Sequence, residues 1–313
     1  MKSVILRSVV TVMTFGMPTV PTIAESLLWK VSSEDCHLYL GGTIHMLASA
    51  DYPLPSVFGL AYEGSEDLVL ETDLGEMYTP EFQKAVTMLL SYSDGQTLRD
   101  NIRPETYAAL EKHLATRGAT MARFETYKPA MVSLAVTLLE MGRLELTGEG
   151  VDAFFWKQAL ADQRDVLGLE TSDEQLAFLG SMGKGREDEL IVRTLEDVNE
   201  IPVLLKAMKD AWRTGDVLAM EKVALNPFRE EYPELFESLV VTRNNDWMPK
   251  IEALLDTDEV ELVLVGALHL IGEQGLVNQL RERGCTVEQV VPWPVLEDSS
   301  GVPETPADEE AGL

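Results

Sequence analysis

The chain has 313 residues, and 45% of them are hydrophobic, which is enough to bury one large core or two small ones. It carries 25 lysines and arginines against 53 aspartates and glutamates, a formal net charge of −28. Such an acidic balance argues against nucleic acid or an anionic membrane surface as a partner.

The first 24 residues have the composition of a cleavable secretory signal. Lys2 and Arg7 form a basic start, an apolar run follows, and small residues lead to a cleavage position near Ala24. A membrane anchor is the alternative, but the apolar run is short and contains prolines. We therefore expect export to the periplasm or out of the cell, with no stable membrane anchor after the signal is removed.

Short apolar runs that alternate with helical patterns predict an α/β (or α+β) fold. We expect a central mixed, partly parallel sheet covered by helices. The expected strands are residues 38–44, 67–73, 165–169, 261–265 and 287–291.

Helices are expected at residues 80–92, 104–117, 129–141, 152–161, 246–255 and 275–283. The segment 129–141 is apolar all round, which predicts a buried helix. Residues 172–239 read as a helical insertion within one domain that spans 25–296. The acidic tail, 297–313, is expected to be disordered.

Two similar strand-to-histidine turns lie near opposite ends of the chain. Each apolar strand breaks at a glycine, Gly42 or Gly266, and a histidine follows three residues later, His45 or His269. Histidine binds divalent metals and moves protons near neutral pH, so this pattern predicts the two halves of one site. The alternative is a pair of satisfied histidines at the sheet edge, and spacing alone favours neither interpretation.

Acidic residues end two further predicted strands. Glu71 follows three apolar residues, and Glu170 closes the strand at 165–169. Ligands bind at the carboxyl ends of parallel strands, so we expect both acids to lie near His45 and His269. Glu71 is predicted to be a metal ligand or general base, and Glu170 a further ligand or a partner of one. The alternative is that such an acid only caps a helix.

Three other residues are weaker candidates. Arg243 could stabilise an oxyanion, although a surface ion pair is the more common role of such an arginine. Asp73 and Asp152 are expected to be a turn residue and a helix N-cap.

The two cysteines, Cys36 and Cys285, each lie at the start of a predicted strand. If those strands are neighbours in an oxidising compartment, a disulfide would join the two ends of the chain. Two buried free thiols are the alternative.

Seven blocks of sequence, in order, resemble the TraB/PrgY/GumN family. They include Leu38 to His45, Leu70 to Asp73, Gly150 to Phe155, and a last block that contains Arg243-Asn244 and Val265 to Leu270. The resemblance covers residues from about 28 to 291. One departure is Lys128-Pro129-Ala130, where an aromatic residue is expected after the proline.

This resemblance implies kinship with the Tiki metalloproteases, whose paired Gly-x-x-His motifs and an acidic residue are thought to form a metal site. Carried over, it implies His45, Glu71 and His269 as the metal site, with Glu170 and Arg243 in catalytic support. The implied cofactor is a divalent ion, which could be manganese, cobalt or zinc.

The leading hypothesis is an exported metal-dependent hydrolase that acts on a peptide or protein substrate. A non-catalytic protein that binds a peptide or signal in the same cleft is one alternative, and a small-molecule esterase is another. The sequence leaves the substrate, the metal and the oligomeric state open.

Overall fold

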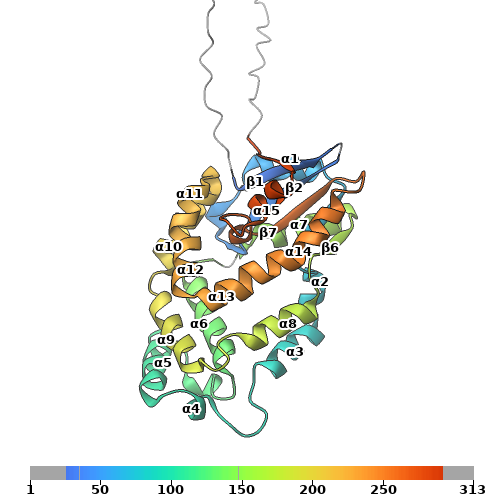
Figure 1. Ribbon diagram of the computed structural model, residues 1–313. Coiled ribbons are helices and arrows are strands. Elements are labelled where there is room, and N and C mark those ends of the chain that lie inside the picture. Colours follow the sequence, from blue (N-terminus) through green and yellow to red (C-terminus); the bar gives the residue numbers. More distant parts are fainter. Residues whose placement is uncertain (1–25, 35, 147, 292–313) are drawn as a thin grey trace, which may run out of the picture.

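A computed structural model describes residues 26–34, 36–146 and 148–291 (Figure 1). The predicted signal at 1–24 and the predicted disordered tail at 297–313 lie outside these residues. Within the described ranges, every helix is too short or too polar to cross a bilayer.

Six strands form one mixed sheet in the order β6-β4-β7-β2-β1-β8. Strands β6, β4, β7 and β2 are parallel, and β1 is antiparallel to both of its neighbours. The prediction of an α/β fold with a mixed, partly parallel sheet is therefore confirmed. The strands are β1 (Leu28–Ser33), β2 (Cys36–Thr43), β4 (Asp67–Leu70), β6 (Val166–Gly168), β7 (Glu261–Gly266) and β8 (Thr286–Gln289).

Strand β7 lies between β4 and β2, and its Leu262 to Val265 are at most 1% exposed. An unbroken apolar run is typical of a parallel strand that is covered on both faces, because side chains on both faces are then buried. The parallel direction also brings the carboxyl ends of β2, β4, β6 and β7 to one edge of the sheet.

The larger of two hydrophobic cores surrounds this sheet. Aromatic side chains join three helices there, and the ring of Phe58 stacks on that of Trp212 with centroids 5.5 Å apart. Phe155 contacts both Phe58 and Tyr62. The helices that contribute to this core include α1 (Ser56–Glu63), α7 (Val151–Asp162), α10 (Ile201–Thr214), α14 (Arg243–Leu254) and α15 (Leu276–Glu282).

A second, smaller core lies among helices at the other end of the molecule, in the lower part of Figure 1. Its apolar side chains come mainly from α4 (Leu98–Asn101), α5 (Pro104–Thr116), α6 (Pro129–Arg143) and α9 (Glu187–Asp197). Glu140 of α6 is buried beside this core, where Arg117, Arg143 and His113 contact its carboxylate. Helix α3 (Pro80–Leu89) packs against α8 (Ser172–Ser181) nearby.

The expectation that the helix at 129–141 is buried all round is wrong. Leu134, Leu138 and Leu139 of α6 are 38%, 46% and 36% exposed, while Val132 and Val136 are buried in the smaller core. Helix α6 packs against α9, and the three exposed leucines lie on a part of its surface that remains accessible.

The region expected as a helical insertion is helical in the structure. Two of its stretches are π-helical, η3 (Glu221–Leu225) and η4 (Glu237–Thr242), and η4 continues directly into α14. The remaining helices of this region are α11 (Val217–Met220), α12 (Asn226–Glu231) and α13 (Pro233–Phe236), after α8, α9 and α10.

Cys36 and Cys285 are both free thiols in the structure. The condition for a disulfide fails, because β1 lies between β2 and β8 and keeps the two strands apart. Two inter-strand steps amount to about 10 Å, which exceeds the Cα separation that a disulfide spans.

Candidate functional site

Four of the residues singled out in the sequence follow the carboxyl ends of the four parallel strands. His45, Glu71, Glu170 and His269 come within three residues of the ends of β2, β4, β6 and β7. Because these strands are adjacent and parallel, all four residues lie at one edge of the sheet. The structure thus brings together the histidines of the two Gly-x-x-His turns.

Three of these side chains surround a single point at Gly266. A Cβ atom added to Gly266 would lie 3.3 Å from Glu71 Oε1, 3.5 Å from His45 Nε2 and 3.6 Å from His269 Cδ2. The Gly266 N–H donates to Glu71 Oε1 at 2.6 Å. The φ of Gly266 is negative, so its backbone conformation does not require glycine. The close approach of these side chains is the reason for a glycine at this position.

His45 is oriented by Asp152 of α7. The Nδ1 atom of His45 lies 2.8 Å from Asp152 Oδ2, which leaves Nε2 directed toward Gly266. Gly150 makes this pairing possible, because a Cβ there would lie 2.3 Å from the carbonyl oxygen of His45. The N-cap of α7 is Gly150, so the prediction of Asp152 as an N-cap is wrong, and Asp152 instead holds His45. Asp73, which was expected to be a turn residue, is the N-cap of α2 (Leu74–Met77).

His269 is oriented by Asn244 of α14. Its Nδ1 lies 2.7 Å from Asn244 Oδ1, and the Asn244 amide nitrogen donates to the backbone oxygens of His269 and Gln274. This network makes Nδ1 the protonated nitrogen, so Nε2 presents its lone pair to the site, where Arg243 Nη1 lies 3.3 Å away. The ring of Trp247, one turn further along α14, packs against the His269 ring with centroids 4.5 Å apart.

Arg243 joins the two acidic residues of the site. Its guanidinium donates to both carboxylate oxygens of Glu170, at 2.9 and 2.7 Å, and to Glu71 Oε2 at 2.6 Å. All three side chains are at most 16% exposed. The expectation that Arg243 forms a surface ion pair is therefore wrong, because its ion pairs are buried. Glu170 contacts Arg243 and the Trp247 indole N–H, so it positions the arginine.

These charges shift the protonation equilibria of the site. Burial acts to raise the pKa of Glu71, but His269, Arg243 and His45 outweigh it and lower that pKa to about 2. Burial, together with the charges of Arg243 and His45, lowers the pKa of His269 to about 4. The burial of part of the His45 ring acts to lower its pKa, but Asp152 and Glu71 outweigh this effect and raise that pKa to about 9. At neutral pH the site without a metal therefore holds an ionised Glu71, a neutral His269 and a protonated His45, which would have to release its Nε2 proton to bind an ion.

The possible donor atoms are too far apart to coordinate one ion in this arrangement. His269 Nε2 and Glu71 Oε1 are 4.0 Å apart, and Arg243 Nη1 lies 3.3 Å from His269 Nε2. Among the described residues, no three histidine, cysteine or acidic side chains are gathered closely enough to hold an ion as they stand.

A cleft of about 510 Å³ opens beside His45. Its walls include the rings of Tyr78 and Trp156, whose centroids are 5.5 Å apart, and the backbone of Gly148 to Gly150. Strand β3 (Met46–Leu47) pairs with β5 (Gly148–Glu149) at this cleft. His45 is the most accessible of the site residues, with a side chain that is 59% exposed.

Comparison with known proteins gives the same family that the sequence blocks indicate. The sequence profile described as the TraB/PrgY/gumN family matches residues 27–289. The chain is 26% identical over 247 residues to the uncharacterized protein YbaP of Escherichia coli (strain K12), covering 78% of this chain and 88% of that protein.

It is also 23% identical over 340 aligned residues to the metalloprotease TIKI1 of Danio rerio, covering 92% of this chain and 68% of that protein. No solved structure matches the chain. Since the family profile covers most of the chain, from β1 to β8, the protein belongs to the TraB/PrgY/gumN family.

Proposed function

We propose that the protein is an exported metal-dependent hydrolase that cleaves peptide bonds. The observation that carries the proposal is the convergence of His45, Glu71 and His269 on one point at Gly266. The distant likeness to a protein named as a metalloprotease supports the same activity. The basic and apolar composition of residues 1–24 supports export to the periplasm or out of the cell.

The residues at Gly266 fit a divalent ion in their chemistry. His45 and His269 both turn Nε2 toward the site, and each has its Nδ1 held by a side-chain oxygen, which is a common arrangement for metal-binding histidines. Glu71 adds an ionised carboxylate. These three side chains would hold manganese, cobalt or zinc, and the absence of Cβ at Gly266 leaves the space for it.

A divalent ion bound there supplies Lewis acidity for attack of water on a peptide carbonyl. Glu71 would either complete the coordination of the ion or, as an ionised carboxylate, accept the proton of the attacking water, a role for which its low pKa makes it a weak base. Arg243 Nη1 makes only two long polar contacts, at 3.3 and 3.4 Å, so it retains the capacity to donate to the oxygen that becomes negative. Glu170 keeps that guanidinium in place.

The cleft beside His45 would receive the substrate. Two aromatic rings and an exposed stretch of backbone offer apolar contacts and hydrogen bonds to an extended peptide. The substrate we propose is accordingly a peptide or protein segment, with no role for nucleic acid.

Metal analysis of purified protein tests the proposal. The His45→Ala and His269→Ala variants should each lose bound manganese, cobalt or zinc, while His37→Ala serves as a matched control because His37 lies on β2 away from the site. Cleavage of a peptide library should require the same two histidines and stop when EDTA is added. Unchanged metal content in both variants would reject the assignment.

A binding protein without catalysis is the second candidate. The observation that favours it is the ion pair of Arg243 with Glu71, which neutralises the carboxylate without a metal. Saturable peptide binding without cleavage, in the presence of manganese, cobalt or zinc, would support this candidate. Cleavage of esters but not of peptides would identify an esterase.

A further inference from the structure

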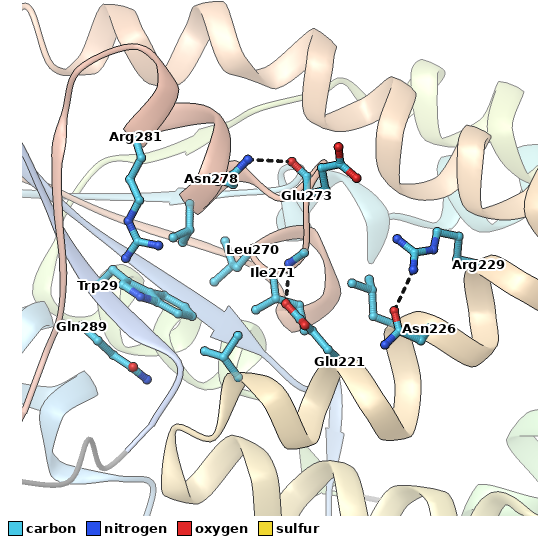
Figure 2. Close-up of a pocket in the computed structure, with 14 residues that line it drawn as sticks. Trp29, Glu221, Asn226, Arg229, Leu270, Ile271, Glu273, Asn278, Arg281 and Gln289 are labelled. Atoms are coloured by element: carbon cyan, nitrogen blue, oxygen red, sulfur yellow. Dashed lines mark hydrogen bonds between the residues drawn. The ribbon is translucent and has the colours of Figure 1, made fainter.

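A second pocket, of about 650 Å³, lies where the helical insertion meets the segment that follows His269 (Figure 2). One wall comes from α11, η3 and α12, and the opposite wall from the Leu270–Glu273 turn and α15. Trp29 of β1 and Gln289 of β8 close one end. None of the proposed metal ligands lines this pocket, so it is separate from the site at Gly266.

The floor of the pocket is apolar. Trp29, Leu225, Leu270 and Ile271 are all at most 3% exposed, and they face the pocket from both walls. Gly272 allows the walls to approach, because a Cβ there would lie 2.5 Å from Leu225. Because these side chains are almost fully packed against their neighbours, the pocket offers a ligand a limited apolar surface beside its polar groups.

The rim carries opposite charges that are not paired with each other. Arg281 donates to the backbone oxygen of Val287 at 3.1 Å, and Arg229 donates to the Asn226 side chain at 2.9 Å. Neither arginine has a carboxylate partner among the described residues. In a chain with 53 acidic and 25 basic residues, two such arginines in one pocket favour an anionic group in the ligand.

Two acidic residues, Glu221 and Glu273, line the same space and balance the charge of the two arginines. Glu221 accepts the backbone N–H of Gly272 at 3.1 Å, which holds its carboxylate against the turn. Figure 2 shows this carboxylate in the middle of the pocket and the Arg281 guanidinium on the Trp29 side. A wholly anionic ligand would be repelled by Glu221, whereas a ligand with both charges would satisfy both residues.

Three amide side chains line the pocket and offer hydrogen bonds between the charges. Asn278 and Gln289 use their amide nitrogens on other oxygens, so their amide oxygens remain available to accept. Asn226 uses its oxygen on Arg229, so its amide nitrogen remains available to donate. Such groups match the alternating donors and acceptors of peptide bonds.

We propose that this pocket binds a short zwitterionic peptide with apolar side chains. Its ammonium group lies at Glu221, its carboxylate at Arg281, its amides at the Asn and Gln side chains, and its side chains on the apolar floor. The volume of about 650 Å³ suits a small peptide better than a single amino acid. The proposal does not depend on hydrolysis at the Gly266 site.

Titration calorimetry with leucyl-leucine tests the proposal. The dipeptide should bind with a saturable signal, and N-acetylated or C-amidated leucyl-leucine should each bind about tenfold more weakly or worse, because one charge is missing. Arg281→Gln should bind leucyl-leucine more weakly than the wild type does, and it should bind leucyl-leucine and its C-amidated form equally. Glu221→Gln should bind leucyl-leucine and its N-acetylated form equally. The glutamine retains a side-chain oxygen that can accept from the Gly272 N–H.

Arg283→Gln is the matched control, because Arg283 pairs with Glu252 on the surface and does not line the pocket. Arg281→Lys retains a charge and should restore part of the binding, which separates loss of the carboxylate contact from loss of fold. The proposal is overturned if leucyl-leucine does not bind, if all three ligands bind equally, or if Arg281→Gln and Glu221→Gln bind as the wild type does.

Discussion

The two Gly-x-x-His turns contain glycines with different structural roles. A Cβ on Gly42 would lie 3.1 Å from the backbone of Ala267, whereas the three atoms nearest to a Cβ on Gly266 all belong to side chains. Gly42 therefore permits the close packing of β2 against the second turn. Gly266 preserves the space between the proposed metal ligands.

We predict that Gly266→Ala and Gly42→Ala have opposite effects. Gly266→Ala should change the free energy of unfolding by less than about 1 kcal/mol, because its φ of −52° suits alanine, but should weaken metal binding about tenfold or more. Gly42→Ala should cost about 1–3 kcal/mol of stability through overpacking and leave the metal affinity of the folded protein intact. Urea unfolding and metal titration measure the two quantities, and the reverse pattern would contradict the assignment.

A metal ion bound at Gly266 would compete with Arg243 for Glu71. Replacement of Arg243 by glutamine removes the guanidinium that pairs with the buried Glu71 and Glu170, which should cost about 3–5 kcal/mol. Excess manganese should then raise the unfolding midpoint of Arg243→Gln more than that of the wild type, because Glu71 is free to bind it. The surface variant Arg186→Gln should unfold close to the wild-type midpoint and show the wild-type response to manganese, because exposed ion pairs contribute little to stability.

At the scale of elements, the sequence patterns predicted the presence of strands and helices better than the residues at which they begin and end. The apolar run of β7 and the proline-started helices α5 and α6 were found within a few residues of their bounds. The strand expected at 67–73 ends at Leu70, because Glu71 turns into the site and Asp73 caps α2. Helix α14 begins at Arg243, ahead of the expected start, because the two asparagines that follow have low helix propensity and tertiary hydrogen bonds of Asn244 compensate.

The partners of the site residues were harder to predict than the residues themselves. Strand ends placed His45, Glu71, Glu170 and His269 at one edge, because parallel strands share direction. Asp152 and Asn244 act through contacts across 107 and 25 residues of sequence, respectively. Those contacts depend on how α7 and α14 pack on the sheet, and no local pattern records that packing.

The smaller core gives a prediction for stability against pH. Burial acts to raise the pKa of Glu140, but hydrogen bonds and charges from Arg117 and Arg143 outweigh it and keep the pKa below its usual value. The stabilisation is therefore present above the unfolded pKa of about 4.3 and is lost as pH falls through the folded pKa.

Glu140→Gln should accordingly be about 2 kcal/mol less stable than the wild type at neutral pH, with the partial exposure of Arg143 limiting the loss. The difference should narrow below a pH of about 4.3. Urea unfolding over this pH range measures it. Glu111→Gln, at an exposed position of α5, is the control, and a difference that stays constant with pH would contradict the expectation.

At the scale of the whole molecule, the two cores separate stability from the site. The sheet core contains β7 and the turn that carries His269, whereas the helical core contains none of the proposed ligands. Damage to either core should unfold the protein more readily. Only damage to the sheet core should also disturb the geometry at Gly266.

Leu110 of α5 and Leu264 of β7 allow a matched comparison, because both are leucines that are at most 1% exposed. Replacement of either by alanine should cost about 2–5 kcal/mol through the cavity that it leaves. Leu264→Ala should also weaken metal binding by the folded protein, since Leu264 lies two residues before Gly266 on the strand that positions His269. Leu110→Ala should bind metal as the wild type does. Metal titration below the unfolding transition decides this, because equal weakening in both variants would mean that the site depends on the whole molecule and not on the sheet core alone.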